Sequence, residues 1–503
     1  FFISLHYPPY LLRADEREHY DNLAEPGRSW LLELLQQYQV EALFAGHVHH
    51  FWHYRHANTD CYLLPSTAFV RQDYSEMFRA APDEASEFGR NDVYKLGYLL
   101  LEIYQNGHLC RPIRTQGTTL ADGHTADQPP ALRLPFPPHP RQQAKLNLGF
   151  DMRKDWLANI EIPPSGGLDE FDRKTVRNDY PLMALWEMGI YQLRIPRTDL
   201  DNATSCERLY GLHTQGMRFT LFSYDVPDNG LLALVQKHSA LLEAWEIAIP
   251  LDKADRLAHA LQALDGNSPP VYLSKLHRKE DVKNHSGTYY HVINHGFAVQ
   301  DENVLTALCQ QPLGAQLAGF VFRIGHTQQI TEAALQTNTL VQKLQRQASL
   351  HVRMGGENPA QPNGDEPWVA VRVAACMACA HALPHCRLFI DTLADVDRGY
   401  FPRMGVLDAL YNPRQGFHVL RNLNALLTHL GNGWHFLEQT EVANGYLYLA
   451  SSEQQTCLLS LQGTLPKDSK PEKIWDLLQA KECLPQHLAS NAEVTPLLCV
   501  IQK

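Results

Sequence analysis

The sequence predicts an α/β protein built from three regions, because the pattern of its apolar residues changes twice along the chain. Residues 1–116 alternate short strands with one clear helix, residues 145–430 alternate strands and helices in a regular rhythm, and residues 431–503 are rich in strands. A proline-rich linker, residues 117–144, separates the first two regions, and six of its prolines fall within twelve positions. Such a run favours a semi-rigid, extended spacer. At 503 residues the chain is too long for one ordinary core.

The first region contains one helix and several short strands. The helix is predicted at Ser29–Tyr38, where Trp30, Leu31, Leu34 and Leu35 recur at helical spacing. Strands are predicted on either side of it, at Phe1–Leu5, Val40–Ala45, Cys61–Leu64 and Tyr98–Tyr104.

The middle region repeats a strand–helix unit eight times in about 250 residues, which is the size and rhythm of a (β/α)8 TIM barrel. Its predicted strands are Leu146–Phe150, Tyr191–Ile195, Arg218–Phe222, Ala244–Ile249, Val271–Leu276, Gly319–Ile324, Leu350–Arg353 and Arg387–Asp391. Helices are predicted between most of them, at Asn229–Leu242, Asp252–Leu264, Gln329–Gln347 and Trp368–Ala382. The extra segment Thr288–Phe297 is expected to extend a barrel loop. The last region is expected to form a small C-terminal β domain.

Composition excludes several classes of function. The profile of 44% hydrophobic and 20% charged residues is typical of a soluble globular protein. A net charge of −11 argues against general nucleic-acid binding, and no apolar run approaches the roughly 20 residues of a membrane span. The ten cysteines are too dilute for a disulfide scaffold. A metal cluster of Cys376, Cys379 and Cys386 with His381 and His385 is conceivable, but the surrounding alanines favour a helix packing face. The compartment is not indicated.

Three histidines lie at the ends of two apolar strands in the first region. His6 ends one strand, and Gly46-His47-Val48-His49 ends the other. Neutral imidazole is a good ligand for zinc, iron, manganese or nickel. His47 and His49 point in opposite directions in an extended segment, which suits two adjacent metals. We therefore predict that the three imidazoles converge in a metal site, the alternative being a histidine-rich surface loop.

These residues resemble the last two motifs of the calcineurin-like metallophosphoesterases, a lone His and Gly-His-x-His, over about 115 residues. The resemblance implies the C-terminal part of an αββα sandwich with two divalent metal ions (Mn, Fe, Zn or Ni) and a phosphoester substrate. By it, His6 and His47 would bind the second metal and His49 the first. The family's first three motifs would precede residue 1, so we expect a fragment of a metal-dependent phosphoester hydrolase that has little activity alone.

The barrel resembles the large clan of retaining glycosidases, over about 300 residues. The resemblance rests on Ala244–Pro250 in the fourth strand and on Gly399–Arg403, Gly405–Asp408 and Tyr411–Arg414 after the eighth. It implies catalytic glutamates at the tips of strands four and seven. This chain instead has Ala248-Ile249 and Arg353-Met354-Gly355 there.

The nearest candidates for a ligand site in the barrel are Glu246, Arg353, Glu357 and Asp391. Retaining hydrolysis requires two carboxyl groups about 5 Å apart, and neither glutamate sits in register for that chemistry. We therefore expect the barrel to lack glycosidase catalysis while remaining able to bind a carbohydrate.

Three functional hypotheses follow. The first is a metallophosphoesterase fused to a non-catalytic, glycosidase-like barrel. The alternatives are a glycoside hydrolase with displaced carboxylates and a non-catalytic carbohydrate-binding or scaffold protein. Phosphoesterase motifs upstream of residue 1 would favour the first hypothesis, and their absence would favour the last.

Overall fold

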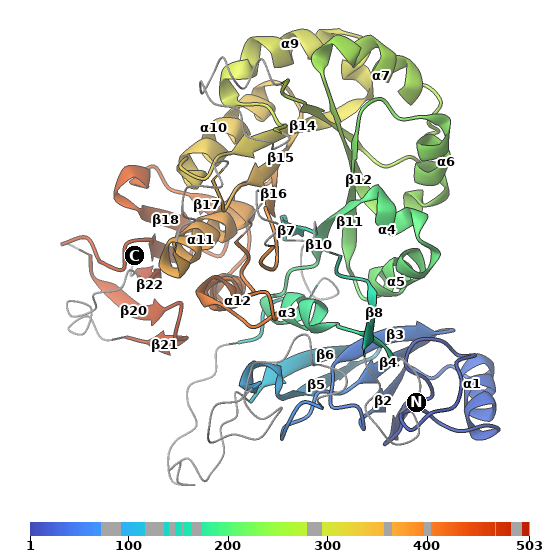
Figure 1. Ribbon diagram of the computed structural model, residues 1–503. Helices are drawn as coiled ribbons and strands as arrows, with labels where there is room; N and C mark the ends of the chain where they lie inside the picture. The colour runs from blue at the N-terminus through green and yellow to red at the C-terminus, as the bar shows by residue number, and fades with distance from the viewer. Residues whose placement is uncertain are drawn as a thin grey trace.

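The computed structural model places three groups of strands side by side: an N-terminal sheet, a closed barrel and a C-terminal sheet (Figure 1). In Figure 1 the N-terminal sheet lies below the barrel and the C-terminal sheet lies to its left. The structure describes residues 1–71, 92–115, 135–139, 146–152, 155–162, 174–278, 294–356, 365–396, 404–467, 469–483 and 495–501.

The N-terminal sheet has four strands in the order β1-β2-β4-β3. The first three of that order run parallel, and β3 pairs antiparallel with β4 at the edge. A separate antiparallel hairpin, β5–β6, follows. The elements are β1 (Phe2–Leu5), α1 (Gly27–Gln37), β2 (Ala42–Ala45), β3 (Trp52–His56), β4 (Thr59–Leu63), β5 (Gly97–Tyr104) and β6 (Gly107–Arg114). A complete αββα sandwich stays a prediction.

Eight parallel strands close into a barrel in the order β10-β11-β12-β13-β14-β15-β16-β7. They are β7 (Leu148–Asp151), β10 (Gln192–Pro196), β11 (Arg218–Tyr224), β12 (Leu242–Ile249), β13 (Val271–Lys275), β14 (Leu317–Ile324), β15 (Gln347–Val352) and β16 (Cys386–Ile390). Each overlaps one of the eight strands expected from the sequence, so the (β/α)8 barrel is confirmed. The fourth strand is β12 and the seventh is β15, as the sequence register predicted.

Helices surround the barrel because their apolar faces cover the strands that they connect. They are α3 (Tyr180–Met188), α4 (Arg197–Asp201), α5 (Ala203–Thr214), α6 (Asn229–Lys237), α7 (Ala254–Leu261), α9 (Glu302–Gln310), α10 (Ile330–Lys343), α11 (Glu366–Ala382) and α12 (Gln415–Leu430). Cys376 and Cys379 are buried within α11, as a helix packing face requires. Among the described helices, none is long and apolar enough to cross a membrane.

A β-hairpin between the first two barrel strands ties the barrel to the N-terminal sheet. Its strands are β8 (Asn159–Ile162) and β9 (Lys174–Arg177). Val176 of this hairpin is fully buried within the apolar cluster of the N-terminal sheet, and Ile160 packs against the same cluster. The two parts of the molecule therefore share apolar contacts.

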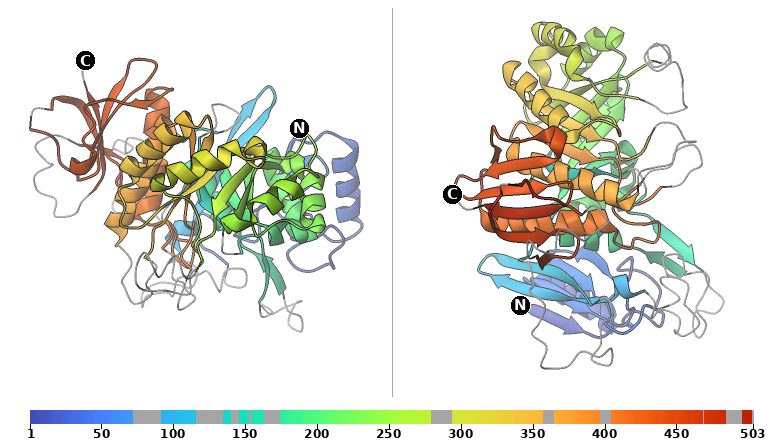
Figure 2. Two further views of the ribbon diagram at one scale, coloured as in Figure 1. Left: turned by 90° about the horizontal axis from the view of Figure 1, so that it is seen from above. Right: turned by 90° about the vertical axis from the view of Figure 1, so that its left-hand side faces the viewer.

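The C-terminal sheet has six strands in the order β17-β18-β19-β22-β20-β21 and confirms the expected small β domain. Its strands are β17 (His435–Phe436), β18 (Tyr446–Ala450), β19 (Thr456–Ser460), β20 (Pro471–Asp476), β21 (Lys481–Glu482) and β22 (Leu497–Ile501). The views in Figure 2 place this sheet beside the barrel, away from α1 of the N-terminal sheet.

Candidate functional site

A buried ionic network crosses the barrel interior at the level of Glu246 in β12. The Arg194 guanidinium of β10 donates from Nε to Glu246 at 2.6 Å and from Nη1 to Asp151 of β7 at 2.8 Å. His351 Nε2 lies 3.0 Å from the Glu246 carboxylate, and the Ser349 hydroxyl donates to it. Four strands therefore contribute to one network of charges.

This network determines the ionisation of Glu246. Burial by itself would raise the pKa of Glu246, but the charges of His351 and Arg194 and the hydrogen bonds from His351 and Ser349 hold it well below its ordinary value. Burial lowers the pKa of His351 itself. Glu246 is therefore an ionised carboxylate, held by these bonds below the mouth of the barrel. A general acid needs a proton at working pH, so this residue is unsuited to that role.

A polar cavity lies above this network, at the C-terminal ends of the strands where TIM barrels bind ligands. Its lining residues carry hydrogen-bonding or aromatic side chains for the most part: Asp151, His295, Arg323, His351, Arg353, Phe389 and Asp391. Arg353 Nε lies 3.3 Å from Asp391 Oδ2. We call this the mouth cavity. Donors and acceptors from several strands therefore meet in it.

Asp151 is the last residue of β7, and Asp391 directly follows β16, the neighbouring strand of the barrel. β16 pairs with β7 through Ile390 and Phe150, so the two aspartates follow a paired position on adjacent strands. Parallel strands lie about 4.8 Å apart. The backbones of the two aspartates therefore lie on neighbouring strands at the rim, and both side chains line the mouth cavity.

A second hollow adjoins the mouth cavity through Asp151. Trp156 and Tyr411 line it with their aromatic rings. The Trp156 indole donates to Asp199 of α4 at 3.3 Å, and burial raises the pKa of Asp199 to about 7. Asp199 follows β10, so a carboxyl group that holds its proton near neutral pH lies on the ligand side of the barrel.

The structure places three of the four residues expected for a barrel ligand site near one another. Asp391 and Arg353 line the mouth cavity, and Glu246 contacts His351, which lines it too. Glu357 lies outside the described residues, as does most of Thr288–Phe297. The sequence did not single out Asp151, Arg194, His295 or His351, although Asp151 follows a predicted strand directly.

Two of the three N-terminal histidines come together. His47 Nδ1 lies 3.1 Å from His6 Nε2, and His47 Nε2 lies 3.1 Å from Asp21 Oδ1. His49 Nδ1 instead lies 3.2 Å from the carbonyl oxygen of Phe69. No group of three or more His, Cys, Asp or Glu residues within the described ranges is arranged to hold a metal ion. These residues do not fit the implied two-metal centre, and the metal roles of the three histidines stay a prediction.

Comparison with known proteins gives structural likeness only. No family model matches the sequence, and no curated protein matches it. A family 39 glycoside hydrolase from Bacteroides cellulosilyticus WH2 shares a TM-score of 0.47 and 9% identity over 81% of this chain and 88% of its own. A glucosidase from Croceicoccus marinus has a TM-score of 0.39 and 13% identity, over 70% of this chain and 81% of its own. Xylanase 10B from Thermotoga maritima has a TM-score of 0.35 and 13% identity, over 56% of this chain and 95% of its own.

These comparisons correct the enzyme class expected from the N-terminal motifs. The three similar structures are glycoside hydrolases and not metallophosphoesterases, so the assignment of the chain as a metallophosphoesterase is wrong. The closed eight-stranded barrel gives the chain a TIM-barrel fold.

Proposed function

We propose that the barrel binds a carbohydrate in the mouth cavity and does not hydrolyse it by the two-glutamate retaining mechanism. The observation that carries this proposal is the set of paired charges around the cavity. Asp151 is paired with Arg194, and Asp391 lies beside Arg353. Charges balanced in this way suit a neutral ligand with many hydroxyl groups, because each hydroxyl both donates and accepts a hydrogen bond.

The aromatic residues beside the cavity support the same ligand class. Phe389 lines the mouth cavity, and Trp156 and Tyr411 line the hollow next to it. Ligand sites combine apolar and aromatic walls with a few polar groups that fix orientation. The apolar face of a sugar packs on aromatic side chains, and the hydroxyl groups at its edge form hydrogen bonds with carboxylates such as Asp151 and Asp391.

The positions of the carboxylates argue against the two-glutamate mechanism. In the described part of the barrel, β12 ends at Ile249 and β15 ends at Val352, and neither end carries a carboxylate. Glu246 lies within β12 and is held by Arg194, His351 and Ser349. It has no proton to give to a leaving group.

A second candidate function is glycoside hydrolysis by displaced carboxylates. It is favoured by the position of Asp151 and Asp391 at the ends of neighbouring strands, because retaining hydrolysis requires two carboxyl groups about 5 Å apart. The raised pKa of Asp199, about 7, favours it too. A carboxyl group whose pKa is raised in this way is suited to act as the general acid.

Calorimetric titration of the full chain tests the proposal. The panel contains methyl glycosides of gluco, xylo, fuco and glucurono configuration, together with their 4-nitrophenyl counterparts for turnover. We expect saturable binding of at least one sugar and no release of nitrophenol. Asp391→Asn should weaken binding roughly 10- to 100-fold, since a hydrogen bond to a charged group contributes about 1.5–3 kcal/mol.

The matched control is Asp265→Asn, the same change at an exposed residue before β13, at the other end of the barrel. It should leave binding unchanged. Equal affinities for wild type and Asp391→Asn, or no binding across the panel, would overturn the proposal. Turnover that Asp199→Asn abolishes would establish the second candidate instead.

A further inference from the structure

His351 of β15 belongs both to the buried network and to the wall of the mouth cavity. It lies two residues after Ser349 on the same strand, so both side chains point into the barrel. The Nε2 atom of His351 lies 3.0 Å from the Glu246 carboxylate, and the same side chain lines the mouth cavity. The imidazole therefore contacts a carboxylate on one side and the cavity on the other.

The carboxylate determines which ring nitrogen of His351 carries the hydrogen. Glu246 is ionised and only accepts hydrogen bonds, so the Nε2 atom of His351 must donate the bond that joins them. Burial lowers the pKa of His351, so the ring is neutral and has a single N–H group. The lone pair is then on Nδ1, which makes this atom a hydrogen-bond acceptor.

The Nδ1 atom of His351 is open to a ligand. It has no hydrogen-bond partner within the part of the chain that the structure describes, and it is not among the atoms that are both unpaired and fully shielded. The rings of His295 and Phe389, which also line the mouth cavity, meet the imidazole edge-on with centroid distances of 5.1 and 6.0 Å. These contacts, together with the bond to Glu246, fix the position of the acceptor.

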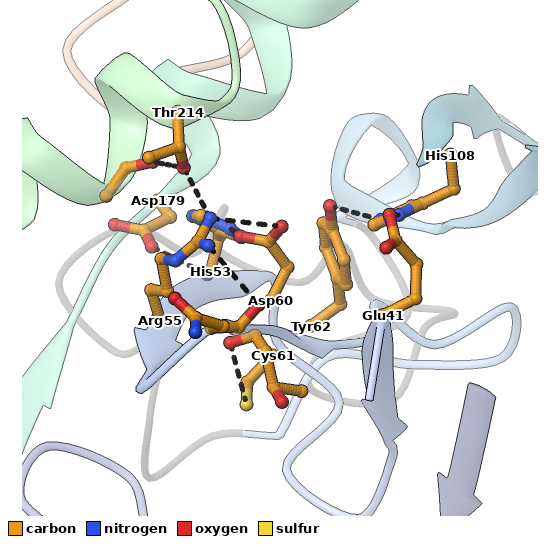
Figure 3. Close-up of polar contacts among 12 residues, drawn as sticks. Glu41, His53, Arg55, Asp60, Cys61, Tyr62, His108, Asp179 and Thr214 are labelled. Carbon is orange, nitrogen blue, oxygen red and sulfur yellow. Dashed lines mark hydrogen bonds and ion pairs between the residues drawn. The ribbon is translucent and has the colours of Figure 1, made fainter. Parts of the chain in front are cut away.

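Another buried histidine, His108 of β6, shows the contrasting arrangement. Its Nδ1 atom lies 2.6 Å from a Glu41 carboxylate oxygen, and its Nε2 atom lies 2.9 Å from the Tyr62 hydroxyl (Figure 3). Both ring nitrogens of His108 therefore have partners in the protein. Buried polar groups are normally hydrogen-bonded, so the open nitrogen of His351 indicates a partner outside the chain.

We propose that His351 Nδ1 selects the ligand of the mouth cavity by accepting a hydrogen bond from one particular hydroxyl group of a sugar. This inference rests on the proposed carbohydrate function and adds to it a residue that determines which sugars bind. A ligand without this hydroxyl would leave a desolvated acceptor unpaired, which costs affinity. Sites built to bond a hydroxyl reject analogues that lack it far more strongly than apolar pockets reject a missing methylene group.

Calorimetric titration of the full chain with fluorinated sugars tests this. The probes are the methyl glycoside that binds most tightly among the gluco, xylo, fuco and glucurono forms, and its monodeoxyfluoro analogues. Fluorine replaces one hydroxyl group in each analogue and donates no hydrogen bond. We expect at least one analogue to bind wild type roughly tenfold more weakly than the parent sugar.

The variant His351→Gln shows which loss of affinity belongs to this residue. The glutamine amide can still donate to Glu246, so the variant should fold, but no acceptor replaces Nδ1. It should bind the parent sugar roughly tenfold more weakly, and it should bind one analogue that wild type rejects as well as it binds the parent. A purely structural role would weaken the parent and all analogues alike.

The matched control is His108→Asn, whose amide replaces the nitrogen that faces Glu41. It should bind every probe as wild type does. Parent-sugar affinity that His351→Gln leaves unchanged would overturn this inference while the carbohydrate site remains, and so would fluorine effects that all persist in that variant. No binding of any parent sugar would refute the proposed function and this inference with it.

Discussion

The substitution Glu246→Gln, which removes the buried carboxylate of the barrel network, should destabilise the fold strongly. The change keeps the shape of the side chain but removes the charge that pairs with Arg194 at 2.6 Å and with His351 at 3.0 Å. Glutamine keeps one oxygen to accept a hydrogen bond, while its amide donates where two donors already converge. Removing one partner of a buried ion pair costs about 3–5 kcal/mol, and we expect a loss in that range.

Urea unfolding followed by tryptophan fluorescence measures this loss. The matched control is Glu243→Gln on the same strand, a residue whose side chain is 21% exposed and paired with Arg218. It should cost about 1 kcal/mol or less, as partly exposed pairs do. Equal losses of stability in the two variants would refute the reasoning that burial determines how much the network contributes to the free energy of unfolding.

The pH dependence of Glu246→Gln gives a second measurement. The pKa of Glu246 is lowered in the folded protein, while an unfolded glutamate titrates at about 4.3. The stability contributed by its ionised form is therefore present above that pH and is lost as the pH falls towards the folded value. The difference in the free energy of unfolding between wild type and the variant should become smaller below about pH 4. A constant deficit from pH 7 to pH 3 would contradict this.

Three further predictions concern groups outside the network. Burial lowers the pKa of His381 to about 4, below the value of about 6.5 for an unfolded histidine. The free energy of unfolding should therefore fall by about 3 kcal/mol through this residue as the pH drops from 7 to 4, and urea unfolding of His381→Gln at the two pH values should show a fall smaller by that amount. Lys95→Met removes a fully buried ammonium from Asp92 at 2.9 Å and should cost about 3–5 kcal/mol in urea unfolding, whereas a loss below 1 kcal/mol would contradict it. Burial raises the pKa of Cys376 to about 12 and that of Cys379 well above its ordinary value, so both should resist a thiol reagent at pH 8 until urea unfolds the chain.

The barrel could be predicted from sequence because its strands are buried on both faces and read as continuous apolar runs. Ala244–Ile249, for example, includes Trp245, Ile247 and Ile249, which are all fully buried in β12. The edge strand Trp52–His56 carried no such signal, because two of its five residues are histidines. His53 is nevertheless buried, with its ring 5.6 Å from that of Trp186 on α3. This contact joins distant segments, and periodicity cannot reveal it.

In the candidate site, too, some features could be predicted from the sequence and others could not. The sequence could indicate that Arg353 and Asp391 lie directly after strands, because strand order determines which strand ends meet, whereas Glu246 lies within β12. It could not reveal that Arg194 bridges Glu246 and Asp151, since these partners are 52 and 43 residues away. In the N-terminal region, the sequence predicted that His6, His47 and His49 converge, and the structure places His6 and His47 in contact. It gave no sign that the ring of His49 contacts the carbonyl of Phe69.

The hairpin β8–β9 has a practical consequence for anyone who divides this protein. Phe51 and Tyr62 of the N-terminal region belong to the same apolar cluster as Trp186 of α3, while Val176 of the hairpin belongs to the N-terminal cluster. Each part thus completes the interior of the other. A shorter version that starts in the proline-rich linker would expose Val176 and Trp186 to water and would be prone to aggregate. Expression of the barrel by itself is therefore a poor route to its ligand, and changes at single positions in the intact chain are the sounder experiment.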